Sequence, residues 1–177
     1  MDTNIQSVIE RLHRSRSAID RLMAPNSPGV YALFVCGLGA VGGIPAGEDG
    51  LIYVGVSNDL AAREFEQHFS SNGTGFSTVR RSIGAILKSQ LHLEAIPRST
   101  WSQPSLYRFR DDGERRLTNW MGDNLEVGVC SIGEALDVET ELILALKPAL
   151  NLTKWENPER AEIKRLRKIC ACEAQGG

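Results

Sequence analysis

Two short segments rich in β-branched and aromatic residues, joined by a glycine-rich loop, limit the possible folds of this chain more than any other feature. Residues 29–36 read GVYALFVC and residues 51–56 read LIYVGV. Runs of this kind are typical of strands. The loop between them holds six glycines and one proline, a composition that does not sustain a helix. We therefore expect a long β-hairpin.

The remaining chain adds a third strand and several helices. LEVGVC at 125–130 is expected to be a core strand, and 106–109 a short one. Apolar spacing, helix-forming composition and the position of Pro148 predict helices near 4–23 (with Thr3 as a candidate cap), 59–69, 78–91, 134–146 and 158–172. Together these elements predict an α/β (α+β) fold, with a small antiparallel or mixed three-stranded central sheet flanked by helices.

The length and composition favour one compact core. The chain has 177 residues, 42% of them hydrophobic and 24% charged. We expect a helical extension over 1–26, the main domain over 27–155 and a helical tail over 156–177. The apolar runs are shorter than the roughly 20 residues that span a bilayer. The first residues also lack the apolar stretch of a secretory signal, so a cytoplasmic protein is expected.

Neither the cysteines nor the net charge indicates a special class of protein. Cys36, Cys130, Cys170 and Cys172 do not form the paired Cys-x-x-Cys spacing of a zinc site, so we expect reduced thiols. The formal net charge is −2 and the sequence pI is about 5.9. These values argue against nucleic-acid binding by bulk charge. Any contact with DNA must therefore be local.

The segment GLGAVG at 37–42 matches the G-x-G-x-x-G pattern of dinucleotide-binding turns. That mechanism requires a helix directly after the third glycine, with its N-terminus at the pyrophosphate. Here more glycines and a proline follow, and the next predicted element is the strand at 51–56. We therefore interpret the segment as a hairpin connection and expect no nicotinamide or flavin cofactor.

Several side chains could together hydrolyse a phosphodiester, a reaction that needs an activated water, a cation and a group that stabilises developing charge. Tyr31 and Tyr53 occupy similar places on the two hairpin strands and would lie close together if they share a face. Arg63 and His68 follow on the next predicted helix, and Glu139 lies in the late one. Taken singly, such residues are usually packing or solvated groups.

Their order and spacing resemble the GIY-YIG nuclease family over residues 29–151. GVY at 29–31 stands for the first signature and YVG at 53–55 for the second, with Val in place of Ile in both. The family's arginine lies ten residues after the second-signature tyrosine, and Arg63 stands at that position.

The late helix carries the most specific part of the resemblance. Residues 139–151 read ETELILALKPALN. In the family, this helix has a metal-binding glutamate followed by a Leu-Ile pair, then Lys-Pro and Asn. By that register, Glu139 rather than Glu141 is the metal ligand.

The resemblance implies a GIY-YIG-like fold and a metal-dependent endonuclease that acts on DNA, with RNA not excluded. Tyr31 would help activate the attacking water, Tyr53 would orient it or the phosphate, and Arg63 would stabilise the transition state. Glu139 would hold one Mg²⁺ or Mn²⁺, a hard cation that keeps several waters. Tyrosine ordinarily titrates near ~10. Tyr31 must therefore have its pKa lowered by Arg63 or the metal, or pass its proton to a group such as His68.

Three further residues are candidate nucleic-acid contacts. Arg80 and Arg81 follow a GFST turn near a predicted helix start, where backbone N–H groups and the guanidinium pair could grip a phosphate. Equally, both arginines could pair with acidic side chains on the surface. Asn151, the residue matching the family's asparagine, completes the expected set.

Two other functions are compatible with these residues. One is a non-catalytic module on the same fold that binds nucleic acid or protein. The other is a nucleotide-dependent enzyme that uses the glycine loop. A homodimer would be needed for concerted cutting of a palindromic site, because symmetry in the site mirrors symmetry in the protein.

Overall fold

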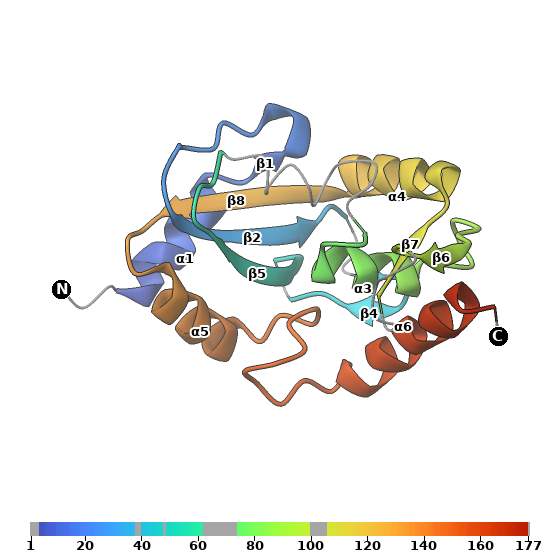
Figure 1. Cartoon of the computed structure of the whole chain (residues 1–177). Coiled ribbons are helices and arrows are strands. Elements are labelled where there is room, and N and C mark those ends of the chain that lie inside the picture. Colours follow the sequence, from blue (N-terminus) through green and yellow to red (C-terminus); the bar gives the residue numbers. More distant parts are fainter. Residues whose placement is uncertain (1–3, 38–39, 48, 62–73, 100–105, 177) are drawn as a thin grey trace.

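A computed structural model describes residues 4–37, 40–47, 49–61, 74–99 and 106–176. Its centre is a four-stranded antiparallel sheet in the order β1-β8-β2-β5 (Figure 1). The strands are β1 (Ser17–Ala18), β2 (Gly29–Val35), β5 (Leu51–Ser57) and β8 (Leu125–Ser131). The predicted hairpin and third strand are confirmed, and the two-residue β1 extends the sheet at one edge.

Strand β2 is buried along its whole length because the sheet is covered on both faces. Its alternate side chains contribute to two different apolar clusters, as the two-residue period of a strand requires. One cluster lies against α1 (Ile5–Arg14) and α5 (Ala135–Leu146). The other extends into α3 (Thr78–Ile86), α4 (Asp111–Asn124) and α6 (Arg160–Ala174).

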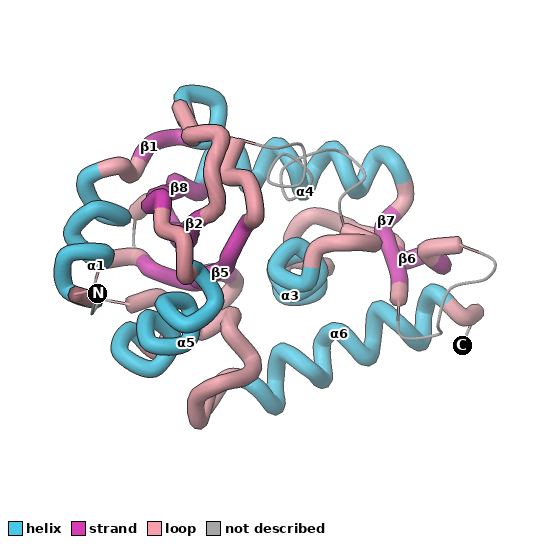
Figure 2. The backbone as a smooth tube through the Cα atoms, turned by 60° about the vertical axis from the view of Figure 1, so that its left-hand side comes forward, coloured by secondary structure: helices cyan, strands magenta, loops and turns pink. Residues whose placement is uncertain are grey.

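These two groups of helices lie at opposite ends of the molecule (Figure 2). A small antiparallel sheet of β6 (Ala95–Pro97) and β7 (Tyr107–Phe109) accompanies the second group. The combination of helices with antiparallel strands confirms the predicted α+β class. Within the described ranges, no helix is both long and apolar enough to cross a membrane.

The N-terminal helix is shorter than the predicted 4–23. It ends at Arg14, and Asn4 caps its start by accepting a hydrogen bond from the backbone N–H of Gln6. Ser15 then bonds through its side chain to both the N–H and the C=O of Val129, each at 2.8 Å. A serine hydroxyl that competes for backbone groups in this way ends a helix. The next residues form β1 and a 3₁₀ turn, η1 (Ile19–Arg21).

The glycine-rich loop carries a second, shorter hairpin made of β3 (Ala40–Val41) and β4 (Ile44–Pro45). Gly42 and Gly43 form its turn with φ angles of 54° and 93°, a region that glycine enters without steric cost. The element that follows the G-x-G-x-x-G pattern is therefore a strand, as expected.

Helix α4 was not predicted from the sequence. Its first turn is acidic, with Asp111, Asp112 and Glu114, and such charges are favourable at a helix N-terminus. Gly113 and Gly122 interrupt the segment, and few apolar residues mark its buried face, so the periodicity is weak.

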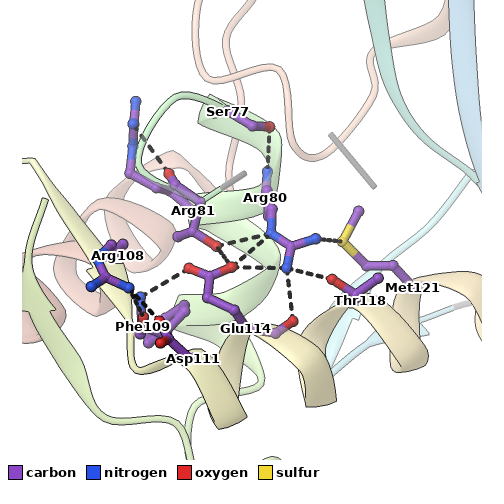
Figure 3. A network of polar contacts seen from close by, with 10 residues as sticks. Ser77, Arg80, Arg81, Arg108, Phe109, Asp111, Glu114, Thr118 and Met121 are labelled. Carbon is purple, nitrogen blue, oxygen red and sulfur yellow. Dashed lines mark hydrogen bonds and ion pairs between the residues drawn. The ribbon is translucent and has the colours of Figure 1, made fainter. Parts of the chain in front are cut away.

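A fully buried ion pair joins α3 to α4 (Figure 3). Arg80 and Glu114 both have 0% exposed side chains, and Arg80 Nη2 lies 2.8 Å from Glu114 Oε2. Arg80 also donates to Thr74 Oγ1 at 2.9 Å and Thr118 Oγ1 at 2.8 Å. The second carboxylate oxygen of Glu114 accepts the backbone N–H of Phe109. The pair therefore ties two helices to the strand β7.

We expect Glu114→Gln to lower the free energy of unfolding by about 3–5 kcal/mol, because it leaves a buried guanidinium without its counter-charge. Urea denaturation would measure the loss. The matched control is Asp111→Asn, which breaks an exposed pair with Arg108 and should cost less than about 1 kcal/mol. Equal losses in the two variants would contradict a structural role for the buried pair.

Candidate active site

Two phenols lie together on one face of the central sheet. In the β2–β5 register, Tyr31 stands opposite Gly55 and Leu33 stands opposite Tyr53. Tyr31 and Tyr53 are therefore diagonal neighbours on the same face. Their ring centroids are 6.1 Å apart, with planes inclined by 44°. The predicted proximity of the two tyrosines is confirmed.

Gly55 provides the space in which the Tyr31 ring lies. A Cβ atom at position 55 would stand 2.6 Å from both Cζ and Oη of Tyr31. No side chain fits there unless the ring moves. The Tyr31 ring is therefore the steric reason why position 55 of the YVG segment is a glycine. The sequence alone gives the residue but not this contact.

Both phenols hold their protons strongly. Burial, and then the neighbouring Tyr53, raise the pKa of Tyr31 well above its ordinary value. Burial and the Glu139 carboxylate also raise the pKa of Tyr53. A hydrogen bond between the two phenol groups also affects both pKa values, after burial and charge. Tyr31 is therefore a neutral phenol at neutral pH.

The Glu139 carboxylate faces this pair from α5. It acts on the pKa of both tyrosines, and its side chain is only 13% exposed. Lys154, which sequence reasoning missed, forms an ion pair with Glu139 Oε2 and donates to Thr140 Oγ1 at 3.1 Å. No motif marks this lysine, because the contact depends on how the loop after α5 turns back.

That loop is held in place by buried hydrogen bonds. Asn151 accepts the backbone N–H of Val54 and donates to its C=O, each at 2.8 Å. Trp155 Nε1 donates to the carbonyl of Asn151 at 2.9 Å, and Lys154 itself has a φ of 74°. The structure thus gives Asn151 a positioning role: its amide bonds strand β5 directly before Gly55.

The other predicted site residues are placed differently or are not described. Arg63 and His68 lie outside the described residues, as does most of the helix predicted over 59–69. Arg80 and Arg81 lie in the first turns of α3 with 0% and 7% exposure. Both guanidinium groups donate to Thr74, but only that of Arg80 pairs with an acid, Glu114 (Figure 3), within the described residues. Arg80 pairs with an acid as the alternative interpretation held, but in the interior and not on the surface.

The donor set around Glu139 fits one hard divalent cation. A carboxylate is the ligand type that Mg²⁺ and Mn²⁺ prefer, and Mg²⁺ keeps several waters when protein ligands are few. The Lys154 ammonium already places a positive charge on this carboxylate. Over the described part of the chain, no group of three or more His, Cys, Asp or Glu side chains gathers anywhere, so Glu139 would act as a single carboxylate ligand. Both cysteines of the tail, Cys170 and Cys172, are free thiols.

Comparison with known proteins gives one family. The sequence model of the GIY-YIG catalytic domain matches residues 45–169, which include Tyr53, Glu139 and Asn151. The matched region begins after Tyr31. No curated protein and no solved structure gives a significant match.

The three tyrosines of the chain, Tyr31, Tyr53 and Tyr107, should ionise only above pH 10 in the folded protein, because burial is the largest cause of each raised pKa. Their contribution to stability is full below the unfolded pKa near 10 and falls as the pH rises above it. Ultraviolet titration of the tyrosinate band measures this, with the urea-unfolded chain as control. A native tyrosine that ionises at pH 10 or lower would contradict the expectation.

Proposed function

The chain belongs to the family of GIY-YIG catalytic domains, and from this membership and the geometry of its site we propose that it is a metal-dependent endonuclease that hydrolyses DNA. The observation that carries the proposal is that Tyr31 and Tyr53 share one face of the sheet, with the Glu139 carboxylate near enough to raise the pKa of both. Two phenols beside a mostly buried carboxylate provide oriented hydrogen bonds and one anionic ligand, which phosphodiester hydrolysis requires.

In this proposal, Glu139 holds one Mg²⁺ or Mn²⁺. Such an ion, when bound, would neutralise charge on the phosphoryl oxygens and acidify a water. Lys154 must then leave the carboxylate or share it, because its ammonium contacts Oε2. The low exposure of Glu139 strengthens any electrostatic interaction made there.

Tyr31 would orient the attacking water. Its phenol group would form a hydrogen bond with that water. Because its pKa is raised, Tyr31 would position the water and not remove its proton as a standing anion. The proton would pass to another group, for which His68 is the candidate. Arg63 would stabilise charge on the transferred phosphoryl group.

The acidic net charge supports a localised substrate contact. With a net charge of −2, the chain lacks the strongly basic surface of proteins that bind DNA by bulk electrostatics. Binding would then depend on the catalytic site and on small basic clusters.

We expect Glu139→Ala, Tyr31→Phe and Arg63→Ala to lower cleavage of DNA by at least about 100-fold, the loss typical when one charge-stabilising group is removed. The assay is a panel of single-stranded, duplex and branched DNA with Mg²⁺, Mn²⁺ or chelator. The matched control is Glu141→Ala, an exposed glutamate on the same helix, which should cleave normally. Undiminished cleavage by Glu139→Ala would reject this residue as the metal ligand. Binding of nucleic acid without turnover under every condition would instead support the non-catalytic alternative.

We expect Lys154→Met to tighten binding of Mn²⁺ by about two- to fivefold, since a partly exposed ion pair contributes up to about 1 kcal/mol. The ammonium competes for the same carboxylate, so its removal frees an oxygen. Electron paramagnetic resonance of free Mn²⁺ measures the affinity without any cleavage. Lys147→Met is the control, because Lys147 and Lys154 line one pocket and Lys147 makes no ion pair within the described ranges. Unchanged or weaker affinity for Lys154→Met would contradict the competition.

A further inference from the structure

A cluster of cations lies at the N-terminal end of α3, contributed by elements other than those of the Tyr–Glu site. The backbone carbonyl of Gly75 accepts hydrogen bonds from two guanidinium groups: from Arg81 Nη1 at 2.9 Å and from Arg98 Nη1 at 3.3 Å. Two positive charges therefore converge on one neutral acceptor. Arg167 of α6 is near enough that its charge, together with burial, lowers the pKa of Arg81.

The described residues supply no acidic partner for this cluster. Among the described residues, Arg81 donates to the carbonyls of Thr74 and Gly75 and to the Thr78 hydroxyl, all of them neutral acceptors. The residue Arg81 is 7% exposed. Its Nε atom is buried and has no hydrogen-bond partner among the described residues. The adjacent Arg80, by contrast, has a full counter-charge in Glu114. A buried cation with an unused donor is costly unless an anion binds to it.

An exposed aromatic ring borders the same cluster. Phe76 is 71% exposed, and the Arg98 guanidinium carbon lies 5.1 Å from its ring centroid. The stem of Arg98 crosses Gly75, where an added Cβ would stand 2.7 Å from Cγ. The glycine therefore lets Arg98 lie flat between the carbonyl and the ring. A cation and an exposed aromatic face are placed side by side, as in surfaces that bind single-stranded nucleic acid.

We propose that Phe76, Arg81 and Arg98 form a second nucleic-acid subsite that takes an unpaired nucleotide, with its base stacked on Phe76 and its phosphate held by the two arginines. An unpaired base is required because the faces of paired bases are covered by their neighbours in the stack. The inference rests on the proposed function and makes it more specific: the substrate carries a single-stranded segment.

The test is binding in the presence of EDTA, which separates affinity from cleavage. The probes are a fluorescein-labelled single-stranded oligodeoxythymidine and a labelled duplex of equal length. Phe76→Leu should weaken single-strand binding at least about fivefold, as expected for one lost stacking contact, with a smaller effect on the duplex. Arg98→Gln should weaken single-strand binding and reduce the salt dependence of its affinity by about 0.7 in the log–log slope, one phosphate contact.

Matched controls separate local from general effects. Ile169→Ala removes another exposed apolar side chain, and Arg165→Gln removes another exposed arginine, both on α6; neither should change single-strand affinity by more than about twofold. Phe76→Trp should keep the affinity and show quenched emission on binding, which a misfolded variant would not do.

Equal losses on single strand and duplex, or unchanged binding by both Phe76→Leu and Arg98→Gln, would overturn the subsite. Normal cleavage of DNA by the unaltered chain in that case would leave the proposed function intact. Selective loss of single-strand binding, with no cleavage by the unaltered chain, would support the subsite and contradict the endonuclease activity.

Discussion

Strand β2 pairs with β5 in a register that puts Tyr31 opposite Gly55, and the candidate site depends on this pairing. A slip of one residue would turn Tyr31 to the other face of the sheet. It would also put another side chain of β2 into the space beside Gly55 that the Tyr31 ring now fills. In the observed register, that ring lies 2.6 Å from the ideal Cβ position of Gly55. The burial of alternate β2 side chains in two separate apolar clusters opposes such a slip.

Asn151 connects this register to the acidic end of the site. Its side chain bonds both backbone groups of Val54, so the loop after α5 is fixed to the edge strand. The same loop brings Lys154 to Glu139. A residue expected to contact nucleic acid thus has a clear structural task. Hydrogen bonds from the Asn151 side chain to the Val54 backbone therefore link the strand that carries Tyr53 to the loop that follows the helix of Glu139.

Arg80 and Arg81 are adjacent in α3, yet their guanidinium groups have different surroundings and different roles. Arg80 is enclosed by Glu114 and two threonine hydroxyls and serves the interior of the protein. Arg81 is nearly as buried, yet its acceptors are neutral and its neighbours are cationic. Successive helix positions point about 100° apart, so the two guanidinium groups meet different surroundings. The first stabilises the fold, and the second leaves a positive site that favours an anion.

The sequence by itself determined the strands, most helices and the chemistry available at the site. A composition rich in β-branched and aromatic residues and the turn residues beside it are local signals, which is why 29–36, 51–56 and 125–130 agree with the observed strands. The order of Tyr31, Tyr53 and Glu139 likewise indicated the family before any geometry was known. Local patterns failed where a distant group intervened: Ser15 ends α1 because it bonds Val129 on β8.

Only the tertiary structure decided which polar groups meet. The ion pair of Lys154 with Glu139 and that of Arg80 with Glu114 join residues 15 and 34 positions apart, and no periodicity encodes such contacts. The raised pKa of Tyr31 was also decided there, because desolvation depends on what packs over the ring. Sequence specifies donors, acceptors and charges, whereas burial and distance, which the fold sets, determine their protonation and their partners.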